Sequence, residues 1–243
     1  MSKMDIVITA CLRPRVLRQT LTSFCKYLFT NPRHYRVILN VDPIGESNTN
    51  WKQVKKVIED FKFGELVINH PSRASYGAAV IWCWSQVTSP YFFHLEDDWV
   101  LLNKVNMDDL ISIMEHNNNI AQIRLSKYSN IGMPDEYHHV LVADGCRPRL
   151  NPCITRKAFT DSVIRYMTPY SNPEKQFNPD FPILWTVCQF WKFYIYNPYK
   201  LPSPKLVKDI GRKWMSTQGY HKVHKDVNSK KVKSTTSFTT WEK

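Results

Sequence analysis

The sequence predicts an α/β fold in which a mostly parallel central sheet carries helices on both faces. Between residues 5 and 95, short apolar runs rich in β-branched and aromatic residues alternate with longer segments whose apolar residues recur at helical spacing. This alternation is typical of parallel sheets with right-handed crossovers. The 243 residues suffice for one large domain, and a hydrophobic content of 43% argues against disorder.

The first part of the chain predicts each element from local signals. Strands are expected where Val, Ile, Tyr and Phe cluster, and helices where apolar residues recur on one face, as Leu17, Leu21 and Phe24 do. In chain order, we expect a strand at 5–10, a helix at 16–29, a strand at 35–42, a helix at 50–62, a strand at 66–70, a helix at 76–87 and a strand at 91–95.

The pattern loosens after Trp99. A helix is expected at 107–117, capped by Asp108 or its neighbour, and a strand follows at 120–126. The apolar run 183–197 combines a helix with a strand. Frequent prolines between these elements predict loops of the kind that grip a substrate, and from about His221 onward few residues are candidates for the core.

Charge and cysteine content narrow the class of protein. The net charge of +12 favours polyanionic partners such as nucleic acid, nucleotide sugars or acidic glycans, and ten Lys or Arg against three acids lie between Lys205 and Lys243. Without other evidence, a solvated tail that aids solubility is the preferred explanation of that surplus. The six cysteines lack a C-x-x-C pair and predict free thiols. No run approaches a membrane span, and the start lacks a secretory h-region, so we expect an intracellular, cytoplasmic chain.

Polar residues follow the predicted strands at their carboxyl ends, the edge where such sheets bind ligands. They lie at 9–13, at Asp42, at 70–73 and at the consecutive acids Glu96, Asp97 and Asp98. Three adjacent carboxylates repel one another unless water or a cation separates their charges. Mg²⁺ or Mn²⁺ bound jointly with a diphosphate is one explanation, because these ions prefer oxygen ligands. An exposed acidic turn, with Asp98 capping a short helix, is the other.

These motifs resemble those of the GT-A glycosyltransferases, the nucleotide-diphospho-sugar enzymes that include family two and the EDD-bearing N-acetylglucosaminyltransferases. The resemblance covers roughly the first half of the chain. It implies that the strand-end motif, usually DxD, is the E-D-D at 96–98, so that Asp98 binds a divalent metal while Glu96 and Asp97 contact the ribose or the donor sugar.

The same resemblance assigns further residues of the donor site. TACLRP at 9–14 matches the first loop, in which Thr9 and Arg13 hold the uracil, and Asp42 matches the acid that accepts from the uracil imide. Arg73 matches a basic donor-site position. On local grounds, Arg13 is equally a surface residue beside a helix-starting proline, and Asp42 a turn residue before Pro43.

A late motif and an acceptor side complete the resemblance. VKDIGRKW at 207–214 matches a segment whose acid reaches the metal, here Asp209, with Arg212 or Lys213 neutralising the diphosphate; a loop Asp paired with a neighbouring cation is the alternative. An inverting transfer also needs a general base. The family pattern points to Glu174, with Asp180 as rival and Asp144 third, whereas a retaining enzyme needs none.

We therefore expect a metal-dependent glycosyltransferase that uses a UDP-sugar and Mn²⁺ or Mg²⁺. Residues 1–125 form its nucleotide-sugar half, 126–220 its acceptor half and 221–243 a basic arm. Some phage enzymes of this broad type modify hydroxymethylated bases in DNA, an acceptor that suits the basic charge; lipopolysaccharide or another anionic glycan suits it too. The non-enzymatic alternative is a basic nucleic-acid-binding module. Zinc spacing, a P-loop and G-x-S-x-G are absent from the sequence.

Overall fold

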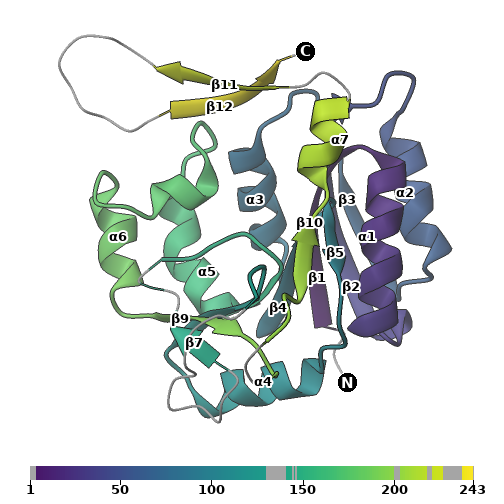
Figure 1. Ribbon diagram of the computed structural model, residues 1–243. Helices are drawn as coiled ribbons and strands as arrows, with labels where there is room; N and C mark the ends of the chain where they lie inside the picture. The colour runs from purple at the N-terminus through teal and green to yellow at the C-terminus, as the bar shows by residue number, and fades with distance from the viewer. Residues whose placement is uncertain are drawn as a thin grey trace.

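The computed structural model describes residues 4–129, 141–143, 145, 147–199, 203–217, 221–226 and 237–242. The first part alternates strictly between strands and helices, as the sequence predicts (Figure 1). Its elements are β1 (Met4–Leu12), α1 (Pro14–Tyr27), β2 (Tyr35–Gly45), α2 (Trp51–Asp60), β3 (Glu65–Asn69), α3 (Tyr76–Ser85) and β4 (Tyr91–Glu96). A short 3₁₀ helix, η1 (Pro32–His34), precedes β2.

The second part contains shorter elements. They are β5 (Trp99–Leu101), α4 (Met107–His116), β6 (Ile120–Leu125), β7 (Leu141–Ala143), β8 (Cys153–Arg156), α5 (Lys157–Val163), η2 (Ile164–Tyr166), η3 (Pro173–Gln176), α6 (Pro182–Cys188), β9 (Lys192–Tyr196), β10 (Val207–Asp209) and α7 (Gly211–Thr217). The helix and strand expected within 183–197 are confirmed as α6 and β9. The helix expected at 107–117 is confirmed as α4, but its cap is Asn106 rather than Asp108, because the Asn106 side chain accepts a hydrogen bond from the Asp108 amide.

The described strands of the central sheet run in the order β3-β2-β1-β4-β8-β6-β9-β7. β3, β2, β1 and β4 pair in parallel, which confirms the predicted parallel core. β8 lies antiparallel between β4 and β6, and β6 pairs in parallel with β9. The carboxyl ends of the four parallel strands therefore lie at one edge, next to the segment that precedes β8, because Cys153 at the start of β8 pairs with His94 near the end of β4.

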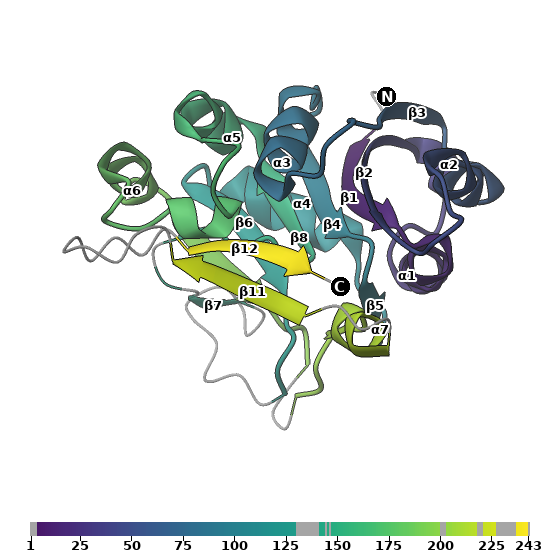
Figure 2. The same cartoon turned by 90° about the horizontal axis from the view of Figure 1, so that it is seen from above.

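Alternating residues of β1 divide the core between the two faces of the sheet. Ile6 and Ile8 pack with α1, α2 and α4, whereas Val7 packs with α3, α5 and α6. Figure 2 shows β1 and β2 between α3 on one side and α1 and α2 on the other. The sequence supports the helices locally: Asn50 and Gln53 form a capping box at α2, and Ser75 caps α3 through the Ala78 amide.

Two small antiparallel pairs lie outside the central sheet. β10 pairs with β5, so that Asp209 lies opposite Trp99. The final pair is the hairpin of β11 (His221–Asp226) and β12 (Ser237–Glu242), which lies at the same end of the molecule as α7 (Figure 1). Sequence patterning did not predict this hairpin, because its strands carry mainly polar residues.

Two composition-based predictions are tested by the described residues. Cys11, Cys25, Cys83, Cys153 and Cys188 are free thiols, as expected; Cys146 lies outside the described residues. In the part of the chain that the structure describes, no helix has the length and apolar character that a bilayer crossing demands.

Candidate active site

The acidic triplet is held where β1 and β4 end side by side. In the sheet register, Thr9 of β1 lies opposite Glu96 of β4 and also opposite Asn40 of β2. The Asp97 amide donates to the Thr9 carbonyl at 3.1 Å, so the backbone of the triplet continues the strand pairing. The convergence expected from strand order therefore brings Thr9 next to the acids.

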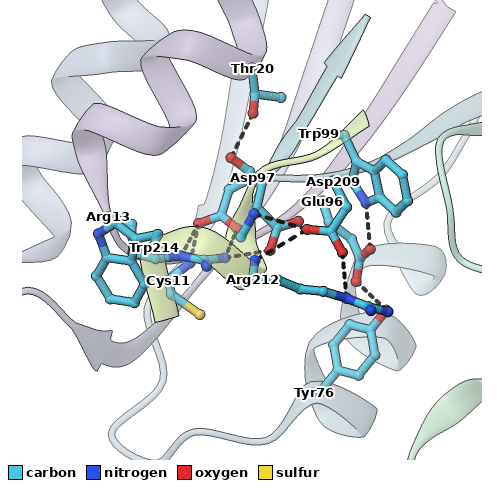
Figure 3. A network of polar contacts seen from close by, with 12 residues as sticks. Cys11, Arg13, Thr20, Tyr76, Glu96, Asp97, Trp99, Asp209, Arg212 and Trp214 are labelled. Atoms are coloured by element: carbon cyan, nitrogen blue, oxygen red, sulfur yellow. Dashed lines mark hydrogen bonds and ion pairs between the residues drawn. The ribbon is translucent and has the colours of Figure 1, made fainter. Parts of the chain in front are cut away.

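Asp97 faces the interior and is paired with Arg13. Only 1% of Asp97 is exposed, and Arg13 contacts both of its carboxylate oxygens, with Nε 3.2 Å from Oδ2. The Cys11 amide donates to the same Oδ2 at 3.0 Å, and the Thr20 hydroxyl donates to the Asp97 carbonyl at 2.7 Å (Figure 3). Burial lowers the pKa of Arg13, but the charges of Asp97 and Asp98 and the hydrogen bond to Asp97 contribute to a larger combined effect, so the pKa is raised. Asp97 thus anchors the triplet to the start of α1.

Glu96 lies on the other side of the triplet and meets two neutral donors. Tyr76 Oη donates to Oε1 at 2.7 Å, and Trp99 Nε1 donates to Oε2 at 2.9 Å (Figure 3). Burial, followed by the negative charge of Asp98, raises the pKa of Glu96 to about 8. Glu96 is therefore a partly buried carboxyl group held by a hydroxyl and an indole.

Asp98 contacts the late motif of the chain. Its carbonyl accepts a hydrogen bond from the Ile210 amide at 2.8 Å, and a Cβ placed on Gly211 would lie 2.0 Å from its Oδ2. Arg13 Nη2 lies 3.2 Å from Asp98 Oδ2. Burial and the charge of Asp97 raise the pKa of Asp98 to about 6, against the opposing charge of Arg13, and Asp209 contributes in the same direction. The pairing of β5 with β10 thus brings two carboxylates 111 positions apart in the chain into electrostatic contact.

Asp209 also caps α7. Its Oδ1 accepts from the Gly211 amide at 2.9 Å and the Arg212 amide at 3.3 Å, and Arg212 Nε lies 3.2 Å from Oδ2. The Arg212 side chain is 84% exposed. The alternative reading of this motif, an Asp paired with a neighbouring cation, is therefore present in the structure.

The residues expected to hold the nucleobase lie at the ends of β1, β2 and β3. Asp42 is buried, and its carboxylate accepts from Asn40 Nδ2 at 2.9 Å and the Ser75 amide at 3.2 Å. Burial raises its pKa. The Thr9 hydroxyl is buried without a hydrogen-bond partner in the described structure, and Arg73 is exposed.

The three candidate bases have different positions. Glu174 lies in η3, and its Oε1 accepts from the Leu150 amide at 2.7 Å. Burial is the main cause that raises the pKa values of Glu96 and Tyr76, and the charge of Glu174 adds to both, so Glu174 lies within electrostatic range of the triplet. Asp180 is exposed in the loop before α6. Asp144 lies outside the described residues.

Sequence reasoning missed the aromatic residues of the site. Tyr76 and Trp99 bind Glu96, and Trp214 of α7 lies over the Arg13 guanidinium, 5.1 Å from its ring centroid. Trp214 Nε1 also donates to Glu46 Oε1 at 3.3 Å. The sequence signal for them is their position: Tyr76 lies just after Arg73, Trp99 directly follows the E-D-D at 96–98, and Trp214 ends the motif at 207–214.

A divalent ion is compatible with these donors. Among the described residues, no group of three or more His, Cys, Asp or Glu side chains is arranged to hold a metal ion. Mg²⁺ or Mn²⁺ bound with a diphosphate needs only one or two protein carboxylates, because phosphate oxygens and waters complete the coordination. Asp98 and Asp209 are hard oxygen donors whose mutual repulsion a cation would relieve. The donor set therefore fits such an ion.

The fold defines a class of protein: the chain has the GT-A glycosyltransferase fold. S. aureus TarS 1–349 in complex with UDP-GlcNAc is similar to it with a TM-score of 0.56 and 12% identity, over 84% of this chain and 57% of that one. The mannosyltransferase PcManGT from Pyrobaculum calidifontis, in complex with GDP-Man and Mn²⁺, is similar with a TM-score of 0.54 and 5% identity, over 82% of this chain and 58% of that one.

The present chain thus spans less than two thirds of the length of either structure. No protein-family model matches the chain, and no curated protein matches its sequence.

Proposed function

We propose that this chain is a glycosyltransferase that moves a sugar from a nucleotide diphosphate sugar, UDP-linked, to a hydroxyl group. The observation that carries the proposal is the pairing of Asp98 with the 209–211 segment at the carboxyl edge of a GT-A sheet. Asp98 and Asp209 are both partly buried at that edge, and their negative charges repel each other, so their proximity does not stabilise the fold. A cation bound by both carboxylates and by a diphosphate would offset this repulsion.

The donor would lie across the ends of β1, β2 and β4. Asp42, whose carboxylate is held by Asn40 and Ser75, would accept a hydrogen bond from the uracil imide. The unpaired Thr9 hydroxyl and Arg73 are available to the same ligand. TarS binds UDP-GlcNAc and PcManGT binds GDP-Man with Mn²⁺, which supports a nucleotide-sugar donor here.

Asp98 and Asp209 would hold the divalent ion. When bound, Mn²⁺ or Mg²⁺ supplies charge stabilisation for the departing diphosphate. The exposed Arg212 side chain is long enough to turn from Asp209 to a phosphate, and Lys213 is exposed beside it. Glu96, on the opposite side of the triplet from Arg13, would accept a hydrogen bond from a hydroxyl of the donor.

We propose Glu174 as the general base of an inverting transfer. The acceptor oxygen attacks the anomeric carbon while Glu174 takes its proton, and the bond from that carbon to the diphosphate breaks with its electron pair leaving on the diphosphate. The closeness of Glu174 to Glu96 supports this choice over Asp180, which is exposed in a separate loop.

The acceptor is proposed from charge. The net charge of +12, and the basic segment after Lys205 that includes the hairpin at the α7 end of the molecule, suit a polyanion. We favour 5-hydroxymethylpyrimidine in DNA, as in phage-type DNA modification, because phosphate contacts supply affinity and a flipped base offers a hydroxyl. An anionic glycan such as lipopolysaccharide is the second candidate.

One experiment tests both donor and acceptor. The protein is incubated with UDP-glucose or UDP-GlcNAc, Mn²⁺, and DNA with or without hydroxymethylated pyrimidines, and the released nucleosides are weighed by mass spectrometry. We expect a mass increase of one sugar on the hydroxymethylated nucleoside only. Transfer to a glycan but not to DNA would overturn the acceptor. Donor consumption that is equal for wild type and Asp98→Asn would overturn the enzyme assignment and favour a nucleic-acid-binding module.

A further inference from the structure

Tyr76 occupies a position that none of the family motifs assigns. It is the first residue of α3, directly after the Ser75 cap, and its hydroxyl lies 2.7 Å from Glu96 Oε1. Trp99 Nε1 holds the other oxygen of the same carboxylate at 2.9 Å. With one donor on each oxygen, both the position and the plane of the Glu96 carboxylate are fixed.

The contrast with Asp97 shows that Glu96 is not a structural ion pair. Asp97 is buried against a guanidinium that contacts both of its oxygens. Glu96, in the described structure, accepts hydrogen bonds from two neutral groups, a phenol hydroxyl and an indole. A carboxylate oxygen accepts more than one hydrogen bond, so each Glu96 oxygen retains the capacity to accept from a ligand hydroxyl.

The first turn of α3 also binds the segment that carries Glu174. Ser75 Oγ donates to the Pro169 carbonyl at 2.8 Å. A Cβ on Gly77 would lie 2.7 Å from that carbonyl oxygen and 2.8 Å from the Ser171 carbonyl oxygen, so only glycine permits this approach. η3 follows at once and brings Glu174 close enough for its charge to act on both Tyr76 and Glu96.

We infer that Tyr76 is a positioning residue for the transferred sugar: its hydroxyl orients Glu96 toward a hydroxyl of the donor sugar. This role rests on the proposed function. Tyr76 then matters for the sugar part of the donor and not for the nucleotide part, which binds at Asp42 and Asp98. In this arrangement, the acceptor hydroxyl that Glu174 deprotonates approaches the sugar from the side on which Glu96 and Tyr76 lie.

The test compares ligands with and without the sugar. Dissociation constants for UDP and for UDP-GlcNAc or UDP-glucose are measured by calorimetry in Mn²⁺ for wild type, Tyr76→Phe and Tyr166→Phe. Tyr166 lies in η2, is partly exposed and has no described contact with the triplet. We expect Tyr76→Phe to bind UDP as wild type does and the UDP-sugar about tenfold more weakly, because the hydrogen bond that orients Glu96 is lost. Tyr166→Phe should bind both ligands as wild type does.

Trp99→Phe removes the second donor to Glu96 and should show the same preference for UDP over UDP-sugar. An equal loss for UDP and UDP-sugar in Tyr76→Phe, or no loss for either, would overturn the role of Tyr76. Failure of the proposed function would give a different result from failure of this inference. In that case the wild type itself would show no Mn²⁺-dependent binding of UDP or UDP-sugar, and the inference would be rejected with the proposed function.

Discussion

The carboxylate of Asp98 rests directly on the Cα of Gly211. A methyl group at residue 211 would lie 2.0 Å from Asp98 Oδ2 and 2.6 Å from its Cγ, closer than two such atoms ever approach. The contact joins the end of β4 to the start of α7, and the hydrogen bond from the Ile210 amide to the Asp98 carbonyl fixes it. The geometry of the proposed metal site therefore depends on a glycine.

Gly211→Ala should displace either the Asp98 carboxylate or α7. We expect Mn²⁺-dependent transfer from a UDP-sugar to fall by about tenfold or more, because small displacements of a catalytic constellation are costly. Steady-state kinetics measures this fall, and Ser216→Ala, at an exposed position of the same helix, is the matched control. Activity that is equal in Gly211→Ala and Ser216→Ala would contradict the dependence on this contact.

Arg13→Met should destabilise the fold strongly, because it leaves the Asp97 carboxylate buried without its cation. Removal of one partner of a buried ion pair costs about 3–5 kcal/mol of unfolding free energy. Urea unfolding measures this loss. The Arg18–Asp60 pair, 2.6 Å long and near the surface, provides the comparison: Arg18→Met should change the unfolding free energy little. Equal losses in the two variants would show that the Arg13–Asp97 pair does not anchor the triplet.

His94 should make the fold less stable in mild acid. It is fully buried in β4, accepts from Trp84 Nε1 at 3.4 Å, and burial lowers its pKa to about 3. Between an unfolded pKa near 6.5 and that value, the unfolded chain binds a proton that the folded chain excludes, so stability is present above the unfolded pKa and falls as pH decreases.

The His94 effect is isolated by comparison with His94→Gln, which cannot titrate. Each pH unit below the unfolded pKa costs about 1.4 kcal/mol from this group alone, so wild type should lose about 2 kcal/mol more than the variant between about pH 7 and pH 5. Urea unfolding at the two pH values provides the measurement. Equal losses of unfolding free energy in both proteins would mean that His94 takes up a proton as readily in the folded state as in the unfolded state.

Glu174→Gln should reduce the rate of transfer by about 10² to 10⁴-fold if Glu174 is the general base. The amide retains an oxygen to accept from the Leu150 amide, so the local structure should survive. Asp180→Asn, the same chemical change in the exposed loop before α6, should leave the turnover number unchanged. The reverse result would transfer the role to Asp180, and unchanged rates in both variants would indicate a mechanism without either base.

The strands and helices up to Glu96 were predictable from the sequence. Strands that are buried on both faces of a parallel sheet consist of short apolar runs, and polar residues on either side mark where each run begins and ends. The same order predicted that Thr9, Asp42 and Glu96 would meet at one edge, and the sheet register confirms that their strands end side by side. Local pattern was sufficient there because each of these four strands spans at least five residues and a helix follows each of the first three.

The rest of the site depends on pairings that local pattern does not encode. β5 and β10 span three residues each, too short for periodicity, yet their pairing brings Asp209 to Asp98. β8 is four residues long and enters antiparallel beside β4. Tyr76 looked like a helix-starting residue, and its contact with Glu96 appears only when α3 is packed on the sheet.

The most direct test of the central claim is the binding of Mn²⁺ in the presence of UDP, followed by electron paramagnetic resonance, for wild type, Asp98→Asn and Asp161→Asn. Asp161 is an exposed carboxylate paired with Lys157 on α5, remote in sequence from the triplet. We expect wild type and Asp161→Asn to bind Mn²⁺ and UDP together. Asp98→Asn should bind them at least about tenfold more weakly. Identical Mn²⁺ and UDP binding by all three proteins would contradict the claim that the acids after Leu95 hold a cation on a diphosphate.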